Sequence, residues 1–370
     1  MEVAIVQELL TRRGGAERIT KIFADLFPNA PIYTLLYDEE KLGDWFPRNR
    51  VHTPKYPAWF SMLPKSLKYN HHLYLKHFPK AIETLEFHKY DVVLSSSSAF
   101  AHGIITNGDP KHVCYVHSPA RYLWDSTHEV MERAGKGLLG GIKKRKLSKI
   151  FHDLRTWDAE AADRPDVLLA NSEEVKRRIE LYWRRESEVV NPPIEDFWFE
   201  KDLRPATCDL SPFLIVSTLT SYKNIDIAIK ACNQLELPLT IVGEGPDKKR
   251  LKKMAGPTIK FLGYKSNEEV RDLYTESKAV LFTCNDDFGL VPLEANACGT
   301  PVIAIDKGGA KETVIDGETG IFFNESTSDS LIEGIHRFTK MNFDSETCIN
   351  HAKGFKREVF EKKILEIINL

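Results

Sequence analysis

One stretch of the sequence, residues 284–305, most constrains the fold of this chain. An apolar run, Ala279–Phe282, leads into it and predicts a buried parallel strand. Asp286 and Gly289 then interrupt the apolar pattern, and a second apolar run follows at Val302–Ile305. The stretch therefore predicts a strand, an acidic and glycine-containing loop, a short helix and a second strand. Such a unit belongs to a parallel α/β sheet.

The short helix in this stretch has a predicted start and end. Pro292 suits the first turn of a helix, where the missing N–H costs nothing, and Gly299 suits its end. The free N–H groups at the helix start predict an anion site suited to a phosphate. Asp286 before the helix and Glu294 within it supply carboxylates that could bind sugar hydroxyls. The alternative is an ordinary strand–helix corner with capping carboxylates.

The pattern Asp-Phe-Gly-Leu-Val-Pro-Leu-Glu, residues 287–294, preceded by Asp286, resembles the acidic-x7-Glu motif of retaining GT-B glycosyltransferases that use nucleotide-sugar donors. Asp286 stands where glutamate is more common, which shortens the side chain and keeps its charge. The resemblance implies that Asp286 binds sugar hydroxyls and that Glu294 binds the ribose. It also implies a donor site at Phe288, Gly289 and Leu290.

Two motifs in the first half of the chain extend the resemblance. A short strand followed by Gly14 and Gly15 predicts a turn at which backbone approaches a ligand closely, although Gly-Gly also marks many ordinary loops. His117 ends an apolar run before Ser118-Pro119, so we expect it at the carboxyl end of a strand, where ligands bind in open α/β sheets. The resemblance implies that both glycines face the donor diphosphate and that His117 contacts the sugar near the reacting carbon. A structural histidine is the alternative.

A wider motif at residues 117–125 resembles a pattern found in bacterial cell-surface polysaccharide mannosyltransferases. It reads His-Ser-Pro-Ala-Arg-Tyr-Leu-Trp-Asp. This similarity implies mannose as the transferred sugar and GDP-mannose as its donor. A UDP-sugar donor remains the alternative.

In the second half of the chain, the family that this sequence resembles has an arginine, then four other residues, then a lysine. In that family the arginine and the lysine both bind the donor diphosphate. Lys223 is present, whereas Thr218 occupies the arginine position. Tyr264 ends a predicted strand and corresponds to the edge that binds the base. The loss of arginine at position 218 keeps open a non-catalytic homologue that binds a nucleotide sugar or glycan.

The length of 370 residues is enough for two domains. We expect a GT-B fold of two doubly wound, Rossmann-like α/β domains facing each other across a cleft. The predicted ranges are 1–205 for an acceptor-side domain, 206–352 for a nucleotide-sugar-binding domain, and 353–370 for a C-terminal helix that crosses back to the first. The net charge of −2 gives no global field for nucleic-acid binding, so no nucleic-acid partner is expected.

Cysteine use and hydropathy bear on location. The six cysteines form no Cys-x-x-Cys pair, and several lie in apolar runs, as expected of buried thiols in a reducing compartment. No apolar run reaches the length of a membrane span, and the start lacks a basic signal region. We expect a cytoplasmic protein, with any membrane association peripheral and on the inner face of the plasma membrane.

Two segments allow a membrane interpretation. Residues 54–79 mix aromatic side chains with lysines and histidines, and residues 143–149 are rich in Lys and Arg on a predicted amphipathic helix. Each suits either a membrane headgroup surface or a core-covering helix with a solvated face. No histidine there has metal-ligand spacing.

The resemblance thus implies a retaining transfer of a hexose, expected to be mannose, from a nucleotide sugar to a glycan or a lipid-linked glycan. No metal or other cofactor is expected, because Lys223 and backbone N–H groups could hold the leaving diphosphate.

Overall fold

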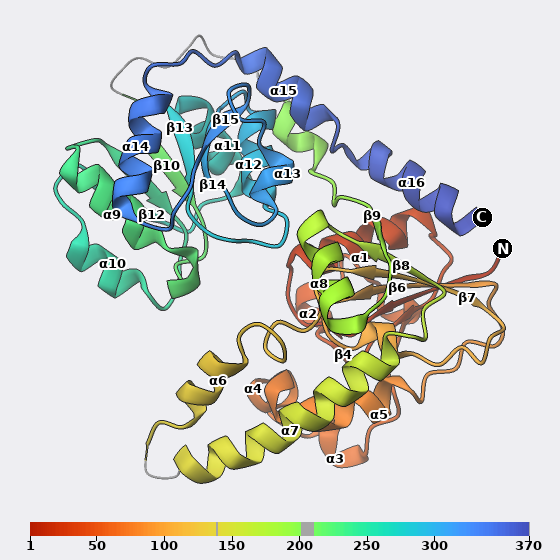
Figure 1. The fold of residues 1–370 in the computed structure, drawn as a ribbon. Helices are drawn as coiled ribbons and strands as arrows, with labels where there is room; N and C mark the ends of the chain where they lie inside the picture. The colour runs from red at the N-terminus through yellow and green to blue at the C-terminus, as the bar shows by residue number, and fades with distance from the viewer. Residues whose placement is uncertain (138–139, 201–210, 370) are drawn as a thin grey trace. The chain divides into compact units, whose positions relative to one another are not determined.

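The computed structural model describes residues 1–137, 140–200 and 211–369 (Figure 1). Contacts within the chain divide it into two units, Met1–Val190 with Lys363–Leu370, and Asn191–Lys362. Each unit is an α/β structure around its own parallel sheet. The predicted domain boundary at 205/206 lies outside the described residues.

The first unit contains a seven-stranded sheet in the order β5-β3-β1-β6-β7-β8-β9, with every neighbouring pair parallel. The strands are β1 (Val3–Gln7), β3 (Ile32–Tyr33), β5 (Val51–His52), β6 (Val92–Ser97), β7 (Lys111–Val116), β8 (Val167–Ala170) and β9 (Glu188–Val189). The strand order reverses direction between β1 and β6. Ligands bind outside the carboxyl ends of the strands at such a point.

Helices cover both faces of this sheet, as alternation of side chains along a strand requires. Val6 and Val93 belong to a core with Phe151 and Leu154 of a long helix, whereas Tyr115 packs on the opposite face. The helices are α1 (Gly15–Leu26), α2 (Glu39–Leu42), α3 (Ala58–Ser61), α4 (Lys65–Lys68), α5 (Phe78–Ile82), α6 (Thr127–Ala134), α7 (Gly140–Ala161) and α8 (Glu173–Trp183).

The second unit contains a six-stranded parallel sheet in the order β12-β11-β10-β13-β14-β15. The strands are β10 (Phe213–Val216), β11 (Leu239–Val242), β12 (Ile259–Gly263), β13 (Ala279–Phe282), β14 (Val302–Ile305) and β15 (Gly320–Phe323). The order reverses between β10 and β13. The predicted strands at both ends of the 284–305 stretch are therefore β13 and β14.

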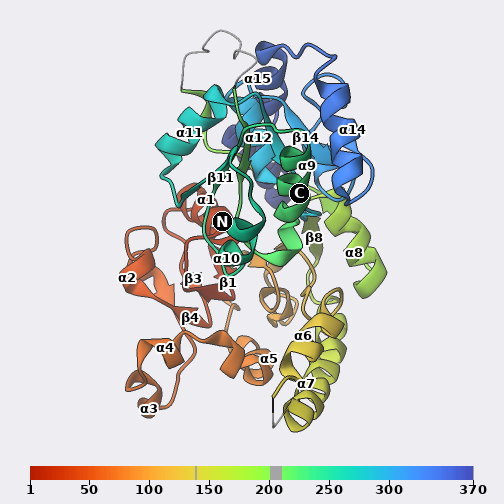
Figure 2. The same cartoon turned by 90° about the vertical axis from the view of Figure 1, so that its left-hand side faces the viewer.

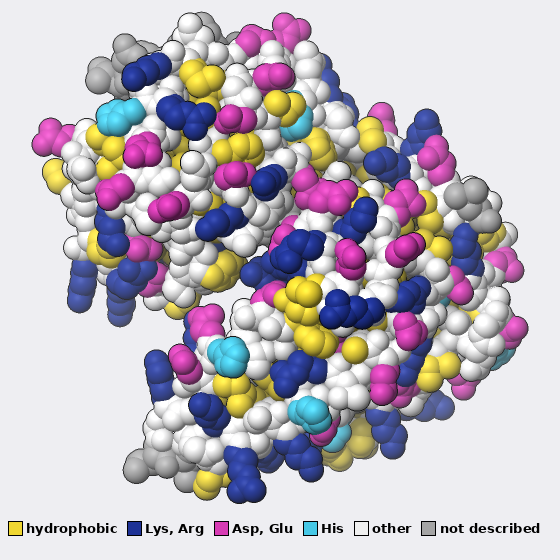
Figure 3. All heavy atoms as spheres, in the orientation of Figure 1, with side chains coloured by type: hydrophobic (Ala, Val, Ile, Leu, Met, Phe, Trp, Pro, Cys, Tyr) yellow, Lys and Arg dark blue, Asp and Glu magenta, His cyan; other side chains and the backbone are white. Residues whose placement is uncertain are grey.

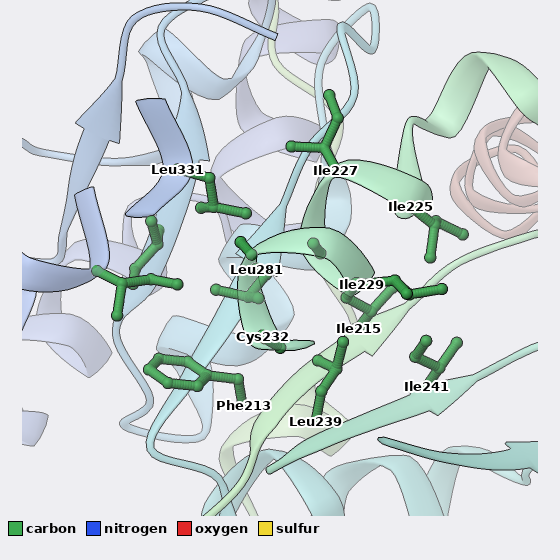
Figure 4. Close-up of a cluster of buried hydrophobic side chains, with 14 of the residues drawn as sticks. Phe213, Ile215, Ile225, Ile227, Ile229, Cys232, Leu239, Ile241, Leu281 and Leu331 are labelled. Carbon is green, nitrogen blue, oxygen red and sulfur yellow. The ribbon is translucent and has the colours of Figure 1, made fainter. Parts of the chain in front are cut away.

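A hydrophobic core lies on each face of this second sheet. On one face, Phe213, Ile215 and Leu281 pack with apolar side chains of the helices α9 and α14, as Figure 4 shows. On the other face, Leu214 and Val280 pack with α11, α12 and α15. The helices are α9 (Ile225–Gln234), α10 (Lys248–Met254), α11 (Asn267–Glu276), α12 (Leu290–Ala297), α13 (Ala310–Thr313), α14 (Ser328–Phe338), α15 (Ser345–Lys353) and α16 (Arg357–Asn369).

In the first unit, residues 31–37 contain β3 and the separate β4 (Leu36–Tyr37), which pairs with β2 (Leu9–Leu10) outside the main sheet. Ser95–Ser97 continue β6 as buried strand residues. Polar side chains are tolerated there because each serine hydroxyl has a histidine partner: Ser95 with His112, Ser96 with His117, and Ser97 with His102.

The aromatic and basic segment at 54–79 is partly buried and partly exposed. Phe60 and Phe78 are buried in the core, where Tyr56 stacks on Phe60 with ring centroids 4.4 Å apart. Trp59 is 57% exposed and Met62 is 83% exposed. The segment therefore contributes aromatic rings to the core and also presents apolar side chains to solvent.

Candidate functional site

The carboxyl edge of the second sheet, where its strand order reverses, gathers most of the predicted donor-binding residues. The loop after β10 leads into the short 3-10 helix η6 (Ser221–Lys223), and the loop after β13 leads into α12. Thr283 joins the loops by donating its hydroxyl to the carbonyl oxygen of Lys223 at 2.8 Å. The topology therefore brings these loops together.

Lys223 and Asp286 form an ion pair in this edge. The Lys223 Nζ lies 2.5 Å from the Asp286 Oδ2 and 3.7 Å from the Cys284 Sγ. Burial by itself would lower the pKa of the Lys223 ammonium, but the charge of Asp286 and the hydrogen bond to it outweigh burial and raise that pKa. The resemblance implied separate roles for these two residues, whereas in the structure they form one ion pair.

The start of α12 adds backbone donors beside this pair. Gly289 caps the helix with a φ of 92°, in the left-handed region that favours glycine, and α12 begins at Leu290. Phe288 is buried immediately before it. The first N–H groups of a helix lack carbonyl partners within it and carry partial positive charge. The predicted helix, including its end before Gly299, is confirmed, and it can bind an anion.

A second loop supports the residues before α12. The N–H of Gly309 donates to the carbonyl oxygen of Asp286 at 3.0 Å. A Cβ at position 309 would lie 2.1 Å from the Cα of Phe288, so only glycine permits this approach. The loop after β14 thereby fixes the backbone around Asp286 and Phe288.

Glu294 lies on the second turn of α12 and is held by a residue that the sequence did not suggest. Tyr274 of α11 donates its hydroxyl to the Glu294 Oε2 at 3.2 Å. The Tyr274 side chain is fully buried, and burial raises its pKa well above the usual value, so the hydroxyl stays protonated. Its apolar spacing in α11 matches an ordinary core residue, so no sequence signal distinguished it.

The remaining predicted residues of this unit lie at the same edge but are more exposed. Thr218 follows β10 with an exposed side chain. Tyr264 follows β12, the outermost strand on that side, and is 82% exposed. Gly243 and Gly263 join the ends of β11 and β12 through an N–H to carbonyl bond of 2.7 Å. Thr218 and Tyr264 are therefore available to a ligand on this edge.

In the first unit, His117 follows β7 as predicted. Its Nε2 lies 2.8 Å from the Ser96 Oγ of β6, and its ring contacts Tyr115 edge-on at 5.3 Å between centroids. Burial lowers the pKa of His117 to about 4. The imidazole is therefore neutral near pH 7, so it acts through hydrogen bonding rather than through a full charge.

Gly14 and Gly15 begin α1, which follows the central strand β1. Gly14 has an extended backbone at the helix N-cap, and a Cβ there would lie 2.7 Å from the Glu17 Oε2. A Cβ on Gly15 would meet no atom within 4 Å. Packing within the chain therefore does not require glycine at position 15, which leaves open space for a ligand.

Glu8, directly after β1, is a buried carboxyl group at the reversal point of the first sheet that the sequence did not single out. Its Oε1 accepts the N–H of Ser98 at 2.8 Å, and its Oε2 has no hydrogen-bond partner among the described residues. Burial raises its pKa to about 7. An acidic residue at the end of an apolar strand was the available signal.

Within residues 1–137, 140–200 and 211–369, no group of three or more His, Cys, Asp or Glu side chains is arranged to hold a metal ion. Over the same residues, no helix combines the length and the apolar character that crossing a membrane would need.

Comparisons with known proteins show a similarity that lies mainly in the second half of the chain. Residues 209–355 match the family model of glycosyl transferases group 1. A D-inositol 3-phosphate glycosyltransferase of Rhodococcus erythropolis is 33% identical over 54% of this chain and 53% of its own length. A GDP-mannose-dependent alpha-(1-6)-phosphatidylinositol monomannoside mannosyltransferase of Mycolicibacterium smegmatis is 30% identical over 32% of this chain and 36% of its own. This chain spans about half or less of the length of the curated relatives it matches.

Solved structures agree on the fold. Anabaena HepE in complex with UDP superposes over the whole of both chains with a TM-score of 0.70 at 17% identity. At that identity the likeness concerns the fold alone. Residues 209–355 thus resemble the glycosyl transferases group 1 domain, and the chain has the GT-B fold of the glycosyltransferases to which it is similar.

Proposed function

We propose that this chain is a retaining hexosyltransferase that moves mannose from GDP-mannose to a glycan or a lipid-linked glycan. The observation that carries the proposal is the cluster at the β10–β13 edge. There, Lys223 and Asp286 adjoin the start of α12 within the segment that matches the glycosyl transferases group 1 model. A cation, two carboxylates and free N–H groups are the chemistry needed to bind a diphosphate and sugar hydroxyls.

Each residue has a proposed role. Lys223 and the N–H groups at Gly289 and Leu290 stabilise the charge that develops on the leaving diphosphate. Asp286 binds sugar hydroxyls, and Glu294 binds the ribose hydroxyls. The backbones of Gly14 and Gly15 also approach the diphosphate, Thr218 offers a hydroxyl donor, and Phe288 and Tyr264 line the sites of sugar and base.

His117 is proposed to contact the sugar near its reacting carbon. A neutral imidazole can donate or accept a hydrogen bond, but it carries no net charge that would attract the departing phosphate. Its bond to Ser96 supports this role, because that bond fixes one ring nitrogen and leaves the other for a ligand.

Two other functions have support from particular observations. A UDP-sugar donor is favoured by the structural neighbour, whose complexes contain UDP or UDP-glucose. A non-catalytic homologue that binds a nucleotide sugar or glycan is favoured by Thr218, which provides no charge where the resembling family has arginine.

Calorimetric titration with GDP-mannose and UDP-glucose tests the donor. The mannose motif at 117–125 and the relative named for GDP-mannose lead us to expect tighter binding of GDP-mannose. Stronger binding of UDP-glucose would reject the donor assignment. Turnover with a panel of glycan acceptors then separates an enzyme from a binding protein.

A lipid-linked acceptor would require contact with a membrane surface. We propose a cytoplasmic protein that associates peripherally with the inner face of the plasma membrane, with no nucleic-acid partner. The basic residues of α7 and the exposed apolar residues at 54–79 support this association.

A further inference from the structure

A groove lies within the first unit between α7 and the segment formed by η3 (Leu75–His77) and α5, and it plays no part in the proposed donor chemistry. Its volume is about 790 Å³. α7 supplies most of its wall, and Lys76 and Pro79 supply part of the opposite side. In Figures 1 and 2, α3, α4, α5 and α7 lie together at one end of this unit.

The groove is strongly cationic. Lys76, Arg145, Lys146 and Lys149 line it, and Asp153 is the carboxylate among the residues that line it. In the part of the chain that the structure describes, none of these four cations pairs with a carboxylate. Lys and Arg side chains also gather over α7 in Figure 3. Such unpaired cations attract an anionic ligand.

The floor of the same groove is apolar. Ile142, Ile150, Leu154 and Trp157, all from α7, line it. Ile142 is 70% exposed, which is costly for an isoleucine in water. A free phosphate would gain nothing from this surface, whereas an alkyl chain would bury it.

The neighbouring segment continues the apolar surface. A chain of ring contacts runs from Phe60 through Tyr74, Phe78 and Phe100 to Trp157 of the groove. These rings are mostly buried, and they tie the segment at 54–79 to α7.

From that anchored segment, four apolar side chains are exposed to solvent: Trp59, Met62, Leu67 and Leu73. Exposed aromatic and aliphatic groups beside cations are characteristic of proteins that lie at the headgroup boundary of a membrane.

We propose that this groove binds an anionic lipid, with the phosphate of its headgroup among Lys76, Arg145, Lys146 and Lys149 and its alkyl chain along the α7 floor. Charge complementarity selects an anion, and the apolar floor selects an amphiphile. The inference rests on the proposed contact with a membrane surface, but it does not depend on the donor or on the transfer reaction.

Flotation with vesicles tests the proposal. The full chain is mixed with vesicles of phosphatidylcholine alone, or of phosphatidylcholine with phosphatidylglycerol. We expect binding only to the anionic vesicles and weaker binding at high salt, since salt shortens the Debye length. The double variant Arg145→Glu/Lys149→Glu should weaken this binding by roughly thirtyfold or more, because each basic residue near an anionic surface contributes about fivefold.

A matched control has the same charge change and the same helical spacing elsewhere. Lys249→Glu/Lys253→Glu alters two exposed lysines of α10 in the second unit. We expect it to bind vesicles like the wild type. A separate variant, Ile142→Ser, leaves the charge unchanged and should weaken vesicle binding several-fold while leaving the fold intact by circular dichroism.

The outcomes test membrane contact and lipid binding in the groove separately. If the wild type does not bind anionic vesicles, the membrane contact itself is rejected. If both double variants lose binding equally, the attraction is diffuse and the groove is rejected while membrane contact stands. If inorganic phosphate binds by calorimetry as tightly as a short-chain phosphatidylglycerol, the ligand is a free anion and the lipid assignment is rejected.

Discussion

At the scale of single residues, the ion pair of Lys223 and Asp286 determines how the donor edge would respond to a ligand. A diphosphate that approaches Lys223 meets a cation whose charge is already balanced at 2.5 Å by a carboxylate. Binding would therefore redistribute Lys223 between Asp286 and the phosphate, and Asp286 would become free for sugar hydroxyls. Neighbouring groups of this kind act as a unit, so their mutational effects should not be additive.

Replacing Lys223 with alanine should lower turnover by about 10²–10³-fold, the scale of losing one preorganised electrostatic donor. The diphosphate gains charge as the glycosidic bond breaks, so the loss should appear mainly in kcat. Initial-rate kinetics measure it. Lys230→Ala, an exposed lysine on α9, is the control and should keep normal rates.

A Lys223→Ala protein with wild-type turnover would show that this phosphate role is wrongly assigned. Thr218→Arg extends the test, because arginine offers a bidentate phosphate contact. Since Thr218 is exposed at the end of β10, space is available, and tighter binding of nucleoside diphosphate is expected by calorimetry.

Tyr274 provides a test of the ribose role of Glu294. Tyr274→Phe removes one hydroxyl and should weaken GDP binding by roughly threefold to tenfold, the value of one hydrogen bond. Binding of 2′-deoxy-GDP should change less, because it offers Glu294 fewer hydroxyls. The ratio of the two dissociation constants, from calorimetry, is the measurement.

A structural control distinguishes positioning from general loosening. Thr300 donates its hydroxyl to the carbonyl oxygen of Tyr274 at 2.7 Å and is buried. Thr300→Val should lower stability without changing the GDP to 2′-deoxy-GDP ratio. An unchanged ratio in Tyr274→Phe would mean that Tyr274 serves packing alone.

At the scale of secondary-structure elements, α7 is attached to the rest of the first unit through a buried carboxyl group. The Asp158 Oδ2 accepts the indole N–H of Trp124 at 2.8 Å and that of Trp183 at 2.7 Å. Trp183 ends α8, so one side chain joins two helices and the loop after β7. Burial raises the pKa of Asp158 to about 7, although both indole bonds act to lower it.

This raised pKa predicts a pH dependence of stability. The folded chain keeps the Asp158 proton up to about pH 7, whereas the unfolded chain releases it near the usual aspartate pKa of 3.8. The stabilising contribution is therefore complete below 3.8 and is lost as the pH rises through about 7. Asp158→Asn cannot ionise, so its free energy of unfolding relative to the wild type should increase between about pH 5 and pH 8.

Urea unfolding of both proteins at the two pH values measures this difference. Thr156→Ala, which replaces an exposed residue on the same helix that does not titrate, should leave the pH dependence unchanged. Equal pH slopes for Asp158→Asn and the wild type would reject a buried, protonated Asp158.

At the scale of the whole molecule, each unit places its polar residues at the carboxyl edge where the strand order reverses. In the first unit this edge holds Glu8, and His117 follows a neighbouring strand. In the second it holds Lys223 and Asp286. The two parallel sheets thus place different groups at the edge where the strand order reverses. The groups of the first sheet are mostly neutral, and those of the second are charged.

We expect transfer activity to survive EDTA. The proposed leaving group is balanced by Lys223 and by helix N–H groups, so no divalent cation is needed for its charge. Initial rates before and after chelation, with magnesium and manganese added back, provide the measurement. Activity that disappears in EDTA and returns with either ion would contradict this account.

The sequence by itself determined the alternation of strands and helices, and with it the doubly wound α/β sheets, whereas the GT-B fold was implied by the resemblance of its motifs. Continuous apolar runs such as Ala279–Phe282 require burial on both faces, and parallel strands require crossover helices. It also determined the limits of α12, because Gly289 and Gly299 act on the backbone locally. By contrast, it could not show that Ser95–Ser97 are strand residues, since their histidine partners are fixed only by packing.

Only the tertiary structure decided which polar groups meet. Lys223 and Asp286 are 63 positions apart, and Tyr274 and Glu294 are 20 apart, so neither pair has a local sequence signal. The burial of Glu8 and Asp158, which raises the pKa of both, likewise depends on surrounding side chains from distant segments. Backbone preferences act over a few residues and are readable in order along the chain. Desolvation and ion pairing depend on distances in space, which exist only once the two sheets have formed.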